Sequence, residues 1–150
     1  MAIFLIAGGT SLAFLLSAAR LPQQTLDLLN LIGLSPWSVL IAINVIYLIL
    51  GCFLDPTSIA VITLPTFVPL VAAMGFDLIW FGIVVTVNIE IGIITPPIGI
   101  KLFVLKSVLP ELSMGDIIMG SIPFVGVLLV FLAIVMLFPQ LSLWLPASMG

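Results

Sequence analysis

The chain has 150 residues, of which 63% are hydrophobic and only 6% are charged. Soluble domains carry about a quarter charged residues, so this composition excludes a water-facing globular domain and predicts an integral membrane protein embedded in the lipid bilayer. Three basic residues exclude nucleic-acid binding by charge. No histidine and a single cysteine exclude, within this chain, a zinc site, a Cys/His or Ser/His catalytic couple and a disulfide.

The first 34 residues predict two elements. Residues 2–19 are uncharged, and a helix of that length measures about 27 Å, enough to span a bilayer. A secretory signal also begins with apolar residues, but this run lacks a basic start and a cleavage context of small residues. Residues 21–34 place Asp27 and Asn30 among leucines at helical spacing, which predicts a short amphipathic connector at the membrane interface.

Two long apolar runs then flank the polar sequence Asp55-Pro56-Thr57-Ser58. Ser35 suits the N-cap of the first run, and Pro36 suits its first helical position. Two interpretations remain open. In one, the polar sequence is an interfacial loop between two full spans. In the other, residues 36–74 form a re-entrant hairpin, and irregular backbone at its tip would imply a binding site.

The second of these runs contains Pro65 and Pro69, which have no amide hydrogen for the helical hydrogen bond. We therefore expect this helix to bend. Gly75 and Asp77 follow, and they predict a turn in which Gly75 ends one helix and Asp77 caps the next.

The predicted span over residues 77–106 contains the most informative sequence, NIEIGIITPPIG, which is residues 88–99. Its two adjacent prolines have no N–H, so the carbonyls of Gly92 and Ile93 lose their helical donors. An unpaired carbonyl in hydrocarbon costs several kcal/mol, and a cation can replace the missing donor. The sequence therefore predicts a broken helix with its break at residues 95–99 and oxygen ligands for a hard cation beside it.

Asn88, Gly92 and Thr95 have the spacing of one helix face, so an amide oxygen and a hydroxyl are expected beside these carbonyls. Glycines 92 and 99 would let an ion or a substrate approach the backbone closely. Glu90 cannot share that face. We expect a structural or coupling role for it, either joining two helices or pairing with Lys101 across the break, ahead of direct ion ligation.

The last predicted span covers residues 117–138, which carry no charge, and Pro139 is expected to end it. Trp144 then marks the membrane interface. Lys101 and Lys106 against Arg20 place the turn after Lys106 in the cytoplasm.

Three stretches carry a resemblance: LGCFLDPTSIAVITLPTFVPL, FGIVVTVNIEIGIITPPIGIKLFV and the ending FPQLSLWLP. They resemble the C-terminal part of the large permease subunit of TRAP transporters, over essentially the whole chain. The resemblance implies an all-α, multi-pass protein of the bacterial inner (cytoplasmic) membrane. Its fold would be one inverted repeat of an elevator-type secondary transporter, with residues 36–74 as a re-entrant helical hairpin and 77–106 as the broken transmembrane helix.

The same resemblance implies sodium-coupled uptake of an organic anion, a C4-dicarboxylate or related carboxylate, delivered by a periplasmic binding protein. It implies no cofactor besides sodium as the coupling ion. The implied partners are the N-terminal half of the permease, the small membrane subunit and the binding protein. Because the first repeat is absent, we expect an incomplete chain. The alternative is a structural membrane subunit or an inactive remnant without transport activity of its own.

A membrane enzyme is disfavoured, because there is no histidine and no second carboxylate near Asp55 or Glu90. We instead expect a transport site in which two cations offset the charge of a dicarboxylate. The residues expected to bind the cation are Asn88, Gly92, Ile93, Thr95 and Asp55. Those expected to bind the anion are Thr57, Ser58, Pro96, Pro97 and Gly99.

Overall fold

The computed structural model describes residues 35–96 and 99–149, together with isolated positions before residue 35. The predictions for residues 2–19 and 21–34 therefore lie largely outside the described residues. Within the described ranges the chain is helical and contains no strand. In chain order the helices are α3 (Pro36–Phe53), α4 (Pro56–Ala73), α5 (Leu78–Ile94), α6 (Ile100–Val108), α7 (Met114–Leu137) and α8 (Gln140–Met149).

The helix starts follow their capping residues. Ser35 caps α3 and accepts a hydrogen bond from the Ser38 amide, with Pro36 at the first helical position as predicted. Asp77 caps α5 by accepting hydrogen bonds from two backbone amides, and Gly75 adopts a left-handed φ of 83° in the turn before it. α7 begins three residues earlier than predicted, because Ser113 caps it through the Asp116 amide.

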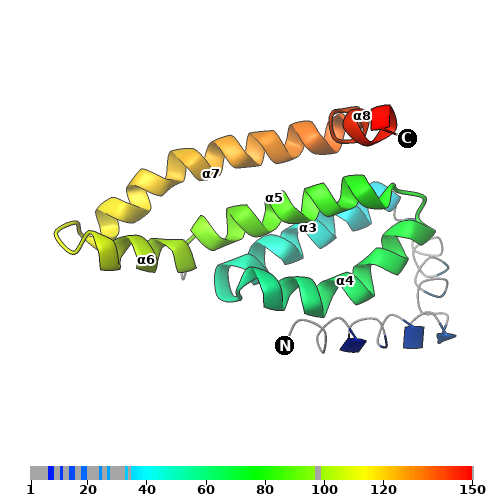
Figure 1. The fold of residues 1–150 in the computed structure, drawn as a ribbon, viewed down its shortest axis with the longest axis horizontal. Helices are drawn as coiled ribbons and strands as arrows, with labels where there is room; N and C mark the ends of the chain where they lie inside the picture. The colour runs from blue at the N-terminus through cyan, green and yellow to red at the C-terminus, as the bar shows by residue number, and fades with distance from the viewer. Residues whose placement is uncertain are drawn as a thin grey trace.

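α3 and α4 form a helical hairpin joined by Leu54 and Asp55, both of which have extended backbone. Figure 1 shows that α3 and α5 run in the same direction, that α4 returns in the opposite one, and that α4 is bent. The bend agrees with Pro65 and Pro69 inside α4. α3, α4 and α7 are each long and apolar enough to cross a membrane, whereas the apolar α5 has only 17 residues.

α5 is the central helix, and it contacts α3, α4, α6, α7 and α8. The core is apolar and includes Leu40, Ile59, Phe81 and Val84, each at most 1% exposed. Most of α7, by contrast, is exposed apolar surface, as expected of a helix whose other neighbours are lipid or further protein.

One polar contact fixes α7 on α5. The indole N–H of Trp80 donates to the carbonyl of Val135 at 2.8 Å, and Trp80 is 1% exposed. That carbonyl has no helical donor, because the residue four positions later is Pro139. The tryptophan therefore supplies the hydrogen bond that the proline removes.

Candidate functional site

Two interruptions of helix lie at the same end of the bundle. We call residues 54–58, which are the two-residue link after α3 and the start of α4, the tip, and residues 95–99, between α5 and α6, the break. α3 and α5 touch at Gly51 and Gly92, where a Cβ added to Gly51 would lie 2.7 Å from the Cα of Gly92. The two helices run in the same direction, and each glycine lies three residues before its interruption (Figure 1). The tip and the break therefore lie at the same height along the α3–α5 pair.

The two ends of the break have different backbone conformations. Thr95 ends α5 with φ −95° and ψ 133°, and Gly99 begins α6 with φ 37°. Position 99 requires glycine for two reasons. Its left-handed φ strains any other residue, and an added Cβ would contact the Leu102 side chain and lie 3.1 Å from the Thr95 carbonyl oxygen. The structure thus ends α5 at Ile94 and begins α6 at Ile100, on either side of the predicted break. Pro96 is half-buried in its turn, while Pro97 lies outside the described residues.

One premise of the predicted cation site is corrected by the break. The amide of Thr95 donates to the carbonyl of Gly92 at 3.0 Å, so that carbonyl is not left without a partner by the prolines. The tightening of the last helical turn to an i to i+3 hydrogen bond explains the difference. Ile93 remains the carbonyl whose i+4 donor is missing, because residue 97 is proline. The hydroxyl of Thr95 donates to the Ile91 carbonyl at 2.6 Å, which leaves its oxygen lone pairs free to accept.

Asp55 is the N-cap of α4, and its carboxylate is engaged at the tip. One carboxylate oxygen accepts from the Ser58 hydroxyl at 2.5 Å and the other from the Ser58 amide at 3.0 Å. Both bonds hold the carboxylate at the first turn of α4. Thr57 beside it is exposed and Ser58 is half-buried. Cation ligation by Asp55 stays a prediction, while its capping role is observed.

Asn88 lies away from the break and is fully buried. Its side-chain nitrogen donates to Asn44 Oδ1 on α3 and to the Val84 carbonyl, the latter at 2.8 Å. Seven residues of helix separate Asn88 from Thr95, a rise of about 10 Å, whereas two ligands of one hard cation lie within roughly 5 Å of each other. Asn88 and Thr95 are therefore too far apart along the helix to bind the same ion, and cation binding by Asn88 stays a prediction. Helix-face spacing places residues on one side but does not place them at one height.

Glu90 pairs with Lys101 across the break, as predicted. The Lys101 Nζ lies 2.5 Å from Glu90 Oε2, and the two side chains are 50% and 53% exposed. This ion pair connects the last turns of α5 to the first turn of α6. It holds the two helices on either side of the irregular backbone.

Sequence analysis missed the polar contacts of α3. Tyr47 is fully buried and its hydroxyl lies 2.7 Å from the hydroxyl of Thr63 on α4, which also donates to the Ile59 carbonyl at 2.7 Å. Asn44 and Gly51 face α5. The sequence did contain a signal for Asn44, because an amide side chain inside an otherwise apolar 18-residue helix is expected to serve binding or helix packing.

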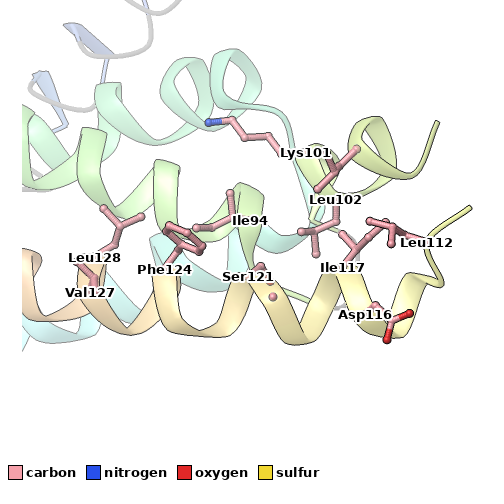
Figure 2. A pocket seen from close by; sticks show the side chains of 12 residues that line it. Ile94, Lys101, Leu102, Leu112, Asp116, Ile117, Ser121, Phe124, Val127 and Leu128 are labelled. Carbon is pink, nitrogen blue, oxygen red and sulfur yellow. The ribbon is translucent and has the colours of Figure 1, made fainter. Parts of the chain in front are cut away.

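A separate cavity of about 620 Å³ lies between α6 and α7 (Figure 2). Its lining is almost entirely apolar, and Figure 2 shows Leu102, Ile117 and Phe124 around it, with the Lys101 side chain extending away from α7. Such a lining offers no oxygen cage for a cation. The tip and the break, not this cavity, are the candidate functional site.

Residues 1–141 match the family model of the DctM component of tripartite ATP-independent periplasmic transporters, abbreviated TRAP. The chain belongs to this DctM family. Membership explains the resemblance of the residues around the tip and the break, and it agrees with the three helices that are long and apolar enough to cross a membrane.

The curated TRAP relatives are named for different substrates. The chain is 40% identical over 150 residues to the C4-dicarboxylate large permease protein DctM of Pseudomonas aeruginosa, covering all of this chain and 35% of the relative. It is 34% identical over 141 residues to the ectoine large permease protein TeaC of Halomonas elongata, covering 94% and 33%. It is 32% identical over 142 residues to the sialic acid large permease protein SiaM of Vibrio cholerae, covering 95% and 33%. The chain thus spans about a third of the length of these relatives.

Proposed function

We propose that this chain forms the part of a TRAP large permease in which sodium and an organic anion bind during sodium-coupled uptake. The observation that carries the proposal is the joint position of the tip and the break, fixed by the contact of Gly51 with Gly92. Irregular backbone at membrane depth is tolerated only where it lines a cavity or is enclosed in protein, and such places bind ions and substrates in secondary transporters.

Sodium is proposed to bind at the break and tip, with the Ile93 carbonyl and the Thr95 hydroxyl oxygen as ligands. The Ile93 carbonyl lacks its helical donor, and the Thr95 hydroxyl uses its proton on Ile91, so both oxygens present lone pairs. Gly92 contributes close helix packing instead of a free carbonyl, and Asp55 contributes a negative charge at the tip. Hard monovalent cations favour such oxygen groups.

The anion is proposed to bind beside the sodium, at Thr57, Ser58, Pro96, Pro97 and Gly99. Thr57 offers a hydroxyl at the first turn of α4, and the left-handed Gly99 exposes backbone at the first turn of α6. Sodium next to a carboxylate offsets its charge in a low-dielectric surrounding, which makes binding of one favour binding of the other. The proposed substrate class is a C4-dicarboxylate or related carboxylate.

Transport needs further chains and further parts of the permease. We propose that a preceding repeat of the permease, a small membrane subunit and a periplasmic binding protein complete the transporter in the bacterial inner membrane. Within it, residues 36–74 would form the re-entrant hairpin of one elevator-type repeat. Two helices joined by two residues and ending beside a helix break favour that hairpin over a pair of full spans.

The test is sodium dependence of uptake by the complete permease with its partners in proteoliposomes. Thr95→Ala is expected to raise the sodium concentration for half-maximal uptake by about tenfold, since a lost ligand costs on the order of 1–2 kcal/mol. Thr95→Ser keeps the hydroxyl and should stay near wild type. Thr86→Val is the matched control, because Thr86 lies on α5 with its exposed hydroxyl bonded to its own helix.

The proposed function fails if wild-type uptake is indifferent to sodium. It also fails if Thr95→Ala and Thr95→Ser behave alike while the protein is normally inserted. Absence of uptake by a complete, correctly assembled wild-type permease across carboxylate substrates would favour the alternative, a structural membrane subunit.

A further inference from the structure

Asn44 and Asn88 form a buried amide pair between α3 and α5. They are 6% and 0% exposed. The two side-chain protons of Asn88 go to Asn44 Oδ1 and to the Val84 carbonyl, and Asn44 donates to the Leu40 carbonyl at 2.7 Å. Asn88 Oδ1 has no hydrogen-bond partner within the described part of the chain. A buried acceptor without a donor is unfavourable, so packing of the two helices must hold the pair in place.

The amide pair is one of two fixed points between the same two helices. The other is the contact of Gly51 with Gly92, where a Cβ added to Gly92 would lie 2.8 Å from the carbonyl carbon of Gly51. Two fixed points set both the rotation and the register of a helix pair. Sliding α3 by one residue moves it about 1.5 Å, which is enough to break the amide hydrogen bond.

This register decides how the tip faces the break. The tip begins three residues after Gly51 and the break three residues after Gly92, so a slide of α3 on α5 displaces one interruption from the other by the same amount. α4 is held differently. It joins α3 through the Tyr47 and Thr63 hydroxyls, and α3 packs more extensively on α5 than on α4.

We propose that Asn44 is a positioning residue: through Asn88 it sets the register of α3 on α5, and thereby brings the tip to the break in the geometry that binds the cation. The inference rests on the proposed function for its sodium clause only. Asn44 contacts neither the break nor the tip, and it acts by holding the helix that carries the tip. Asn88 is its partner in this role.

The experiment uses the complete permease with its partners and two readouts. The first is the sodium concentration for half-maximal uptake. The second is the alkylation rate of Cys52 by N-ethylmaleimide, followed on its own peptide by mass spectrometry. Cys52 is the residue after Gly51, is partly buried, and its amide nitrogen lies beside Gly92, so its modification reports the closeness of the two helices.

Asn44→Ala and Asn88→Ala are each expected to raise the half-maximal sodium concentration about three- to tenfold, the range of an interhelical hydrogen bond in membranes. The double variant is expected to be no worse than the more affected single variant, because both changes remove one interaction. Cys52 should react faster in both single variants, and saturating sodium should slow it back toward the wild-type rate. Thr86→Val, the control on α5, should change neither readout.

Additive effects of the two changes would overturn the proposal, as would an unchanged Cys52 rate in Asn44→Ala. If Asn44→Ala fails to accumulate in the membrane, Asn44→Ser keeps an acceptor for Asn88 at shorter reach and is measured in the same way. Sodium-independent uptake by the wild type would contradict the proposed function. The Cys52 alkylation rates measured without sodium would still test whether Asn44 sets the register of α3 on α5.

Discussion

Gly51 and Gly92 bring α3 and α5 into backbone contact, and any larger side chain at either position would collide with the facing backbone. Small residues at a helix crossing are how helices associate in membranes, where lipid is as apolar as the side chains. Here the crossing lies two residues before the end of each helix, so the closest approach of the two helices also supports the candidate site.

Gly92→Ala is expected to destabilise the permease by about 1–3 kcal/mol, the usual effect of overpacking, and to reduce uptake more strongly. Thermal unfolding of the purified permease measures the first effect. Gly82→Ala on the same helix is the control, because a Cβ there meets nothing within 4 Å. Alanine is a better helix former than glycine, so Gly82→Ala should be neutral or stabilising by up to about 1 kcal/mol. Equal effects at the two positions would contradict the crossing.

Trp80→Phe is expected to lower stability by about 1–3 kcal/mol, because it leaves the Val135 carbonyl without a donor. Trp144→Phe is the matched control, since Trp144 is 72% exposed. Pro139→Ala restores a backbone N–H four residues after Val135. Pro139→Ala should therefore reduce the loss of stability caused by Trp80→Phe when the two changes are combined. Additive effects of the two changes would contradict the view that the Trp80 indole replaces the missing backbone donor.

Glu90→Gln and Lys101→Met remove the ion pair across the break. Both side chains are about half exposed, so we expect the pair to stabilise the protein by no more than about 1 kcal/mol. The charge-reversed combination, Glu90→Lys with Lys101→Glu, should recover most of what either single change loses. Membrane insertion and uptake are measured separately. Normal insertion with lost uptake in Glu90→Gln, without recovery in the reversed pair, would show that Glu90 acts on the ion or the substrate.

Asp55 stabilises the start of α4 by accepting hydrogen bonds from the Ser58 amide and hydroxyl. Asp55→Ala removes this cap and is expected to destabilise the helix start by about 1 kcal/mol. Hydrogen exchange of the Ser58 amide, corrected for its intrinsic rate, should then be faster than in the wild type. Asp55→Asn keeps a capping oxygen and should retain most of the protection. Equal exchange in Asp55→Ala and the wild type would contradict the capping role.

Local sequence signals predicted much of this fold because they act over short distances. Ser35 with Pro36 marks one helix start and Asp77 marks another, and the adjacent prolines mark the break. The pairing of Glu90 with Lys101 was also predictable, because eleven residues across a single break leave few other partners. α8 was not expected, because Pro139 was taken only as the end of a helix, whereas proline also suits the start of the next one.

What sequence analysis missed depends on distant residues. The contacts of Asn44 and Gly51 form only when α3 packs on α5, which brings together residues more than forty positions apart. Asn88 and Thr95 have the spacing of one helix face, but they lie at different heights along the helix axis. Periodicity gives direction around a helix axis, and an ion site also needs closeness along that axis.

The meeting of the tip with the break has an electrostatic consequence. α3 and α5 finish there, and α4 and α6 begin there, so the junction gathers two helix C-termini and two helix N-termini. Aligned peptide dipoles give each C-terminus about half a negative charge and each N-terminus about half a positive one. A cation and an anion can thus each find a helix end of opposite sign at this one junction, and neither requires a dedicated charged side chain.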